Sequence, residues 1–157
     1  MKRPIAVLFA AALLASGTAS ADQQYKNGQE LVGSWKILAT IPGGTPVCPG
    51  AAPCQFHAMA TVISDGTVVQ SVIIPGVTFG HGAWKRTGLR TFRMNALYSR
   101  VDGTGSFVGT SETTIELQVD TSGRTASGSF SADINDTSGN LLTDYDGTVT
   151  AQRIEVN

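Results

Sequence analysis

The residues best suited to chemistry are two cysteines, Cys48 and Cys54, in the segment Cys-Pro-Gly-Ala-Ala-Pro-Cys. Such a pair could form a disulfide, cycle as a redox couple or ligate zinc. Redox pairs typically have the spacing Cys-X-X-Cys at the start of a helix, and no helical pattern follows here. A zinc site needs a complete tetrahedral set of ligands, whereas the one other candidate nearby is His57. We therefore predict a structural disulfide between Cys48 and Cys54 and no metal site.

Acid–base and nucleophilic chemistry has few candidate residues in this sequence. His57 and His81 are the only histidines, and no Gly-X-Ser-X-Gly nucleophile motif occurs. Glu112 and Glu116 would share one face of an expected strand at about 13 Å, which is too far for paired carboxylate catalysis. The C-terminal aspartates match no EF-hand loop and are interpreted as solvated turn residues: Asp133, Asp136, Asp144 and Asp146. We predict no catalytic residues and no cofactor.

Basic residues are concentrated in one stretch, at Lys85, Arg86, Arg90, Arg93 and Arg100. A basic stripe could receive an anionic ligand, but a solvated outer face and turn has the same composition and is the favoured interpretation. The formal net charge is −1, and no aromatic residues interleave with these arginines at stacking intervals. The sequence therefore predicts no binding to nucleic acid.

The elements that must position these side chains are strands. Hydrophobic residues make up 41% of the chain, charged residues only 15%, and glycine occurs 18 times. Apolar and polar residues alternate with period two over several segments separated by Asp-Gly and Ser-Gly turns. The expected strands cover residues 33–41, 56–63, 67–74, 90–101, 107–119, 125–134 and about 147–156, with a further one around residues 82–86 after a loop through Gly80 and Gly82.

Eight short strands in a meander must protect their edges, and closure into a barrel does so. The sequence thus predicts an all-β protein with an eight-stranded antiparallel up-and-down barrel. A two-sheet β-sandwich is the alternative. The barrel is preferred because most connections have the length of nearest-neighbour hairpins, whereas sandwiches commonly need longer crossings.

The N-terminus has the three-part form of a secretory signal peptide. Met1-Lys2-Arg3 is basic, residues 5–15 are almost wholly apolar, and Ala19-Ser20-Ala21 supplies the small residues before a cleavage site. The apolar run of about 11 residues is short of the roughly 20 that a membrane span needs. We expect a signal peptide at residues 1–21, one barrel domain at residues 22–157, and a periplasmic or secreted bacterial protein without stable membrane insertion after cleavage.

A Gly-X-Trp motif, Gly33-Ser34-Trp35, opens the first expected strand, and Arg153 lies in the last. In a closed barrel these strands are neighbours, so the guanidinium could stack on the indole. This pair resembles the calycin superfamily of lipocalin-like barrels, in which a Gly-X-Trp packs beneath an arginine of the final strand. The resemblance implies that Trp35 and Arg153 close one end of an eight-stranded barrel and that a ligand cavity lies at the other. Residues 82–92, 123–130 and 136–147 are also similar to small exported bacterial barrel proteins without assigned activity.

The barrel interior is where specificity would arise. The large side chains predicted to face inward are Trp35, Phe92, Met94, Tyr98, Phe107 and Phe130. Ala96 stands between larger inward neighbours, and a small residue in such a row can mark a cavity. The predicted ligand-binding residues are Phe92, Met94, Ala96 and Tyr98, with Arg90, where Tyr98 or Arg90 would orient a polar group at the mouth.

These observations favour a non-enzymatic exported barrel that binds a small, largely apolar ligand, with or without an anionic head. The first alternative is a cyclase or isomerase of the barrel type, in which a shaped apolar cavity holds a flexible substrate. The second is a filled barrel whose outer surface binds a protein partner. The volume of the lumen distinguishes the two cavity hypotheses from the last.

Overall fold

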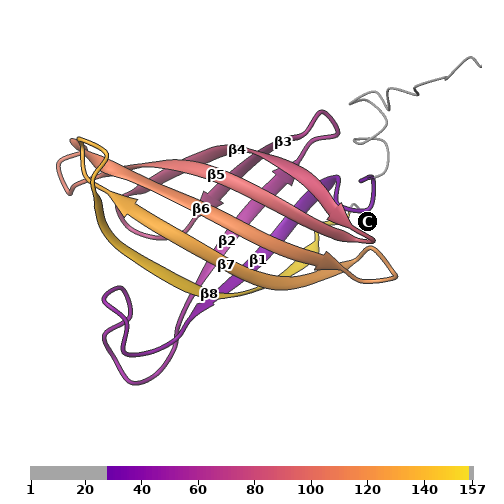
Figure 1. The fold of residues 1–157 in the computed structure, drawn as a ribbon, viewed down its shortest axis with the longest axis horizontal. Coiled ribbons are helices and arrows are strands. Elements are labelled where there is room, and N and C mark those ends of the chain that lie inside the picture. The colour runs from indigo at the N-terminus through magenta and orange to yellow at the C-terminus, as the bar shows by residue number, and fades with distance from the viewer. Residues whose placement is uncertain (1–27, 156–157) are drawn as a thin grey trace, which may run out of the picture.

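Eight antiparallel strands form a closed barrel in the computed structural model, which describes residues 28–155. Each strand pairs with its sequence neighbours, and β1 pairs with β8 to complete the ring (Figure 1). The strands are β1 (Gly33–Ile41), β2 (Cys54–Val62), β3 (Thr67–Val72), β4 (Val77–Gly88), β5 (Thr91–Val101), β6 (Phe107–Val119), β7 (Thr125–Asn135) and β8 (Leu141–Arg153). The up-and-down barrel is confirmed, and the sandwich alternative is wrong. The expected signal peptide and its cleavage site lie outside the described residues.

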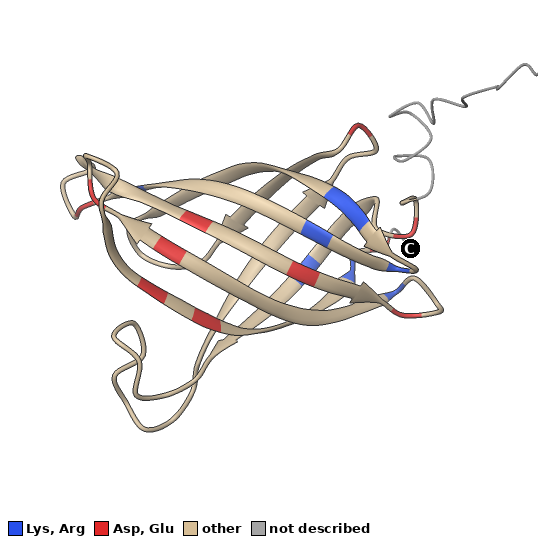
Figure 2. Ribbon diagram, in the orientation of Figure 1, with Lys and Arg blue, Asp and Glu red and all other residues tan. Residues whose placement is uncertain are grey.

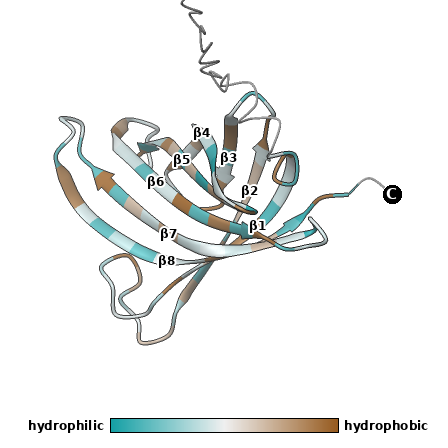
Figure 3. Ribbon diagram, turned by 45° about the vertical axis from the view of Figure 1, so that its right-hand side comes forward, coloured by the Kyte–Doolittle hydropathy of each residue, from teal (hydrophilic) through white to brown (hydrophobic). Residues whose placement is uncertain are grey.

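Alternation of side chains along each strand creates the interior. In β5 the residues Phe92, Met94, Ala96 and Tyr98 are buried, whereas the residues between them are exposed. The same period of two runs through β7, where Phe130 is buried between outward serines. Figure 3 shows the resulting bands of hydrophobic and hydrophilic residues along the strands. The apolar face of every strand thus points to the barrel axis.

The largest differences from the predicted strand boundaries are at the starts of β4 and β8. The expected loop through Gly80 and Gly82 is part of β4, where these glycines pair with Tyr98 and Ala96 of β5. Strands are recognised in a sequence by alternating apolar and polar side chains. Glycine has no side chain, so the residues around Gly80 and Gly82 do not show this alternation. Similarly, β8 begins at Leu141 rather than near residue 147, because its polar first half continues the ladder with β7. Cross-strand pairing, which local pattern does not reveal, extends both elements.

Phe107 is the one large residue whose predicted inward orientation is wrong. Its side chain is 52% exposed. The register of β5 against β6 shifts between Arg100 and Val101, so that Arg100 faces Gly109 and Val101 faces Phe107. This irregularity inserts an extra residue into β6, and a bulge of this kind sends the residues beyond it to the other face. Trp35, Phe92, Met94, Tyr98 and Phe130 are buried as predicted.

The barrel has two different ends. We call one the closed end, formed by residues 28–32 and the turns at residues 63–66, 89–90 and 120–124. The other is the loop end, formed by residues 42–53, 73–76, 102–106 and 136–140. In Figure 1 the closed end lies at the right and the loop end at the left. Leu31 is fully buried, so the segment before β1 packs into the closed end.

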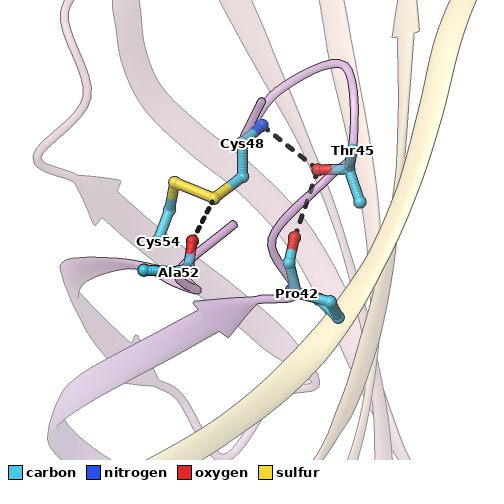
Figure 4. The surroundings of a disulfide bond; sticks show 5 residues. All are labelled: Pro42, Thr45, Cys48, Ala52 and Cys54. Atoms are coloured by element: carbon cyan, nitrogen blue, oxygen red, sulfur yellow. Dashed lines mark hydrogen bonds between the residues drawn. A yellow bond between two sulfur atoms is a disulfide. The ribbon is translucent and has the colours of Figure 1, made fainter. Parts of the chain in front are cut away.

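The longest described connection, residues 42–53, contains the predicted disulfide. Cys48 and Cys54 are joined, with their Cα atoms 5.8 Å apart, and Cys48 is completely buried (Figure 4). Thr45 orders the loop, since its Oγ1 accepts a hydrogen bond from the Cys48 amide at 3.1 Å. For so short a ring, the chain-entropy model gives a stabilisation of about 2 kcal/mol. The disulfide therefore tethers the loop to the start of β2.

Candidate ligand-binding site in the barrel lumen

The closed end is built around Trp35 and Arg153. The two residues face each other in the β1–β8 ladder, and the guanidinium carbon of Arg153 lies 4.4 Å from the centroid of the Trp35 indole. The Trp35 Nε1 donates a hydrogen bond to the carbonyl of Leu31 at 2.8 Å. Arg153 donates to three backbone carbonyls, those of Gly123 at 2.7 Å, Val32 at 2.6 Å and Glu30. The stacking that the sequence predicted is present, and Arg153 also ties three chain segments together.

The geometry explains why glycine precedes Trp35 by two residues. A Cβ atom on Gly33 would lie 2.6 Å from the Nη1 of Arg153, in the space through which the guanidinium reaches Val32. Gly33 also has a φ of 132°, a conformation that residues with side chains rarely adopt. The Gly-X-Trp motif therefore accommodates the side chain of Arg153. Gly33 leaves space for the guanidinium because it has no Cβ atom, and Trp35 provides the ring on which the guanidinium stacks.

A second aromatic cluster fills the closed half of the lumen. Trp84 packs edge-on against Phe92 with centroids 5.8 Å apart, and its Nε1 donates to the carbonyl of Ile63 at 2.8 Å. Arg86 lies over the Phe92 ring at 6.0 Å and forms an ion pair with Glu30 at 3.1 Å. Met94 is also buried in this half. These buried aromatic and apolar side chains occupy the closed half of the lumen.

The loop-end half of the lumen contains a cavity of about 50 Å³. Its apolar walls include Ile37, Ala39, Phe56, Ala58, Val72 and Phe130. Its polar lining comes from Gln70, Tyr98, Ser111, Thr113 and Tyr145. None of the lining residues is charged, and Phe56, Val72 and Tyr145 are only partly buried, which places them at the edge toward the loop end. We call this space the lumen cavity.

One side of the lumen cavity, which we call its floor, is lined by Gln70 and Tyr98, a hydrogen-bonded pair from strands that are not adjacent. The hydroxyl of Tyr98 on β5 donates to Oε1 of Gln70 on β3. Gly80 of β4 lies between them, paired with both residues in the two ladders. A Cβ atom at Gly80 would collide with the Tyr98 ring, so its absence lets the ring cross over β4. A glycine within a strand here serves close approach of a neighbouring side chain.

Gln70 has a buried side-chain donor that lacks a hydrogen-bond partner. The residue is 2% exposed, and its Nε2 is the one fully buried side-chain nitrogen or oxygen without a hydrogen-bond partner among residues 28–155. A buried amide donor without a partner costs about 1 to 3 kcal/mol. Burial also raises the pKa of Tyr98, with a further contribution from Tyr145, so Tyr98 remains a neutral donor to Gln70. The Nε2 protons are therefore left for another acceptor.

Aromatic rings form one wall of the lumen cavity. Phe130 contacts Phe56 on one side and Tyr145 on the other, both edge-on, at centroid distances of 6.1 Å and 6.0 Å. Burial raises the pKa of Tyr145, while the nearby charge of Arg100 acts in the opposite direction. This wall is made of residues from β2, β7 and β8.

The structure brings together only part of the predicted ligand-binding set. Tyr98 lines the lumen cavity. Phe92, Met94 and Ala96 are buried on the same strand but do not line it. Arg90 lies in the closed-end turn with a φ of 59°, and its guanidinium donates to the carbonyl of Asp120. Arg90 and Tyr98 are thus at opposite ends of the barrel.

Among the residues that line the lumen cavity, sequence reasoning predicted only Tyr98 as ligand-binding, and Gln70 is the most informative of those it missed. A usable signal was present, because Gln70 has the same parity in its strand as the apolar residues Val68 and Val72. A polar residue at an inward position of a half-buried strand is an exception that requires a partner or a function. By contrast, no local signal indicates that Tyr98 reaches it across another strand.

Charged residues lie on the outside of the barrel. Figure 2 shows basic residues mainly toward the closed end, whereas acidic residues occur along the strands and at both ends. Glu112, Asp133 and Asp144 are direct cross-strand neighbours on β6, β7 and β8, an arrangement in which like charges repel. Within residues 28–155, no group of three or more His, Cys, Asp or Glu side chains is arranged to hold a metal ion. The interpretation of Asp133, Asp144 and Asp146 as turn residues is wrong, since all three belong to strands.

Asp136 does occupy a turn, and its carboxylate organises it. The Oδ1 accepts hydrogen bonds from the amides of Ser138 and Asn140, each at 2.8 Å. Hydrogen bonding, first from the Asn140 side chain, lowers the pKa of Asp136.

On β6, Glu116 forms an ion pair with Arg93 at 2.5 Å. These acids have structural partners of their own.

A larger hollow of about 780 Å³ lies outside the barrel, over β1, β8, β7 and the turn after β6. Exposed polar side chains contribute to it, among them Lys36, His57, Gln118 and Gln152. It is an open surface depression with no unpartnered buried group, so it carries less information about a ligand than the lumen cavity.

No helix in residues 28–155 is long and apolar enough to cross a membrane.

Neither the family models nor the curated proteins with which the sequence was compared show a match to this chain. The fold and the lumen cavity are therefore the basis on which a function can be argued.

Proposed function

We propose that this protein is an exported, non-enzymatic β-barrel that binds a small, largely apolar molecule in the lumen cavity. The observation that carries the proposal is the partly open apolar space at the loop end, whose lining includes Gln70, the residue with the unsatisfied Nε2. Small-molecule sites are concave and mostly apolar, with a few polar groups that fix orientation. The lumen cavity has these properties.

The volume limits what can enter. An apolar cavity of about 150 Å³ holds one benzene ring. The lumen cavity, at about 50 Å³, accommodates only a few heavy atoms. The ligand is therefore very small, or it inserts a narrow end while the remainder lies against the partly buried Phe56, Val72 and Tyr145 at the edge. A bulky rigid ligand is excluded without rearrangement.

Enlarging Val72 is expected to close the lumen cavity. Val72 lines its edge, so Val72→Phe adds ring atoms where a ligand would pass. We expect at least a tenfold loss in affinity for 2-pentanone, measured by titration of the wild-type and variant proteins with ¹H–¹⁵N NMR. This probe has a short apolar chain and one narrow polar end.

The matched control is Val69→Phe, the same change on the outward face of the same strand. It is expected to leave the affinity for 2-pentanone unchanged. If wild-type protein shows no saturable shifts with 2-pentanone, or if the two variants bind it equally, the lumen cavity is not a ligand site and the proposal is wrong.

The filled closed half of the lumen favours a second candidate function, a barrel that acts through its outer surface on a protein partner. Trp35, Phe92 and Met94 occupy the space that a larger ligand would need. The NMR titration separates the two candidates, because a barrel of this kind shows no saturable shifts at lumen residues. The cyclase or isomerase alternative has no specific observation in its favour.

Export is part of the proposal and has its own expected result. The form of residues 1–21 and the disulfide between Cys48 and Cys54 are both typical of exported proteins. N-terminal sequencing of protein recovered from the periplasm or the medium is expected to begin at Asp22. Protein that retains Met1 and remains in the cytoplasm would contradict export.

A further inference from the structure

We infer that the lumen cavity selects a neutral ligand whose inserted end is a hydrogen-bond acceptor, such as the carbonyl of a ketone, aldehyde, ester or amide, and that Gln70 Nε2 is the donor that recognises it. The inference rests on the proposed function and specifies the ligand chemistry at the same site. It is carried by the arrangement of donors and acceptors at the cavity floor.

The Gln70–Tyr98 pair determines whether the ligand must provide a hydrogen-bond donor or an acceptor. A glutamine side chain offers one acceptor oxygen and two amide protons. The Oε1 of Gln70 already accepts the Tyr98 hydroxyl, and Nε2 has no partner. The group that remains to be satisfied is therefore a donor, so the complementary ligand atom must be an acceptor.

The neutrality of the ligand follows from the walls. None of the residues lining the lumen cavity is charged, and the floor residues Gln70 and Tyr98 are both almost fully buried. An ionised carboxylate placed there would lose its hydration without gaining a counter-charge from the lining, because Arg100 acts on Tyr145 but does not itself line the cavity. Such burial is far more costly than burial of a carbonyl. The anionic head considered from the sequence relied on the basic stripe of residues 85–100, and none of its basic residues lines the lumen cavity. Arg90 lies at the closed end.

A matched pair of probes isolates the acceptor. 2-Pentanone carries a carbonyl, and 2-methyl-1-pentene has the same planar shape with a CH₂ group in place of the oxygen. In wild-type protein, 2-pentanone is expected to shift the side-chain amide resonances of Gln70 in ¹H–¹⁵N spectra, and the alkene is not. Butanoate, which is similar in size but ionised, is expected to bind at least tenfold more weakly than 2-pentanone.

The variant Gln70→Met removes the donor with little change in volume. The ratio of ketone affinity to alkene affinity is expected to fall by about tenfold, the effect of leaving one buried acceptor unpaired. Because Gln70→Met also leaves the Tyr98 hydroxyl without its acceptor, the double variant Gln70→Met/Tyr98→Phe is the second test. It has an apolar floor and is expected to fold and to show the same reduced ratio.

The outcomes separate the inference from the proposed function. If both probes bind to the lumen cavity and the ratio is the same in wild type and in the variants, the protein is a ligand binder but the assignment to Gln70 is wrong. The same conclusion holds if butanoate binds as well as 2-pentanone. If 2-pentanone produces no saturable shifts in wild-type protein, the proposed function itself fails. An unshifted Gln70 amide in a ketone-bound protein would show that the carbonyl lies elsewhere.

Discussion

Truncation of Trp35 to alanine is expected to lower the free energy of unfolding by about 3 to 5 kcal/mol, the range for a buried aromatic side chain. The ring is 2% exposed and stacks under the guanidinium of Arg153. Its loss leaves a void in the closed end and removes the partner of the Leu31 carbonyl. Neighbouring side chains cannot refill this void easily, because the β1–β2 and β1–β8 ladders hold the backbone on both sides.

Urea denaturation followed by far-ultraviolet circular dichroism measures this loss without relying on tryptophan fluorescence. The control is Met59→Ala in β2, a truncation of a residue that is 54% exposed on the outside of the barrel. We expect a loss of about 0.5 kcal/mol or less for the control. A loss of less than about 1 kcal/mol for Trp35→Ala would mean that the ring does not close the barrel.

Replacement of Arg153 by methionine is expected to destabilise the protein by about 2 to 4 kcal/mol. Hydrogen bonds to a charged group contribute about 1.5 to 3 kcal/mol each, but carbonyls at the rim of a barrel can partly rehydrate. Arg153 makes such bonds to Gly123, Val32 and Glu30, which belong to the turn before β7 and to the segment before β1. Methionine keeps much of the apolar stem and removes these bonds and the stacking.

The control for Arg153→Met is Arg124→Met, in the same closed-end region. The Arg124 side chain is 70% exposed and pairs only with Glu155 among the residues that the structure describes. Surface ion pairs contribute about 0 to 1 kcal/mol, so we expect a small effect from this variant. Combining Trp35→Ala with Arg153→Met should cost less than the two single changes together, by about 0.5 to 2 kcal/mol of stacking energy. Strict additivity would show that the ring and the guanidinium do not interact.

Much of the fold was predictable because its signals are local. A strand has a side-chain period of two, so the inward positions of β5 and β7 could be read from the apolar residues Phe92, Met94 and Phe130. Asp-Gly and Ser-Gly turns indicate hairpins within a few residues. The disulfide follows from two cysteines in one short segment, and the closure pair follows from a motif at one end of the chain and an arginine at the other. Where the local signal was weak, as in the glycines of β4 and the polar start of β8, the boundaries were wrong.

The candidate site depended on relations that no single segment contains. Alternation indicates that Gln70 and Tyr98 face inward, but the register of β3 on β4 and of β4 on β5 places them together across Gly80. The turn that holds Arg90 places it at the closed end, although it is only eight positions from Tyr98 in the sequence. Strand register and barrel stagger are set by all the ladders at once, and a shift of one residue reverses every side chain of a strand. Inward orientation is therefore largely a property of the local sequence, with Phe107 beyond the irregularity in β6 as the exception. The unpartnered amide and the cavity around it arise from the closed barrel as a whole.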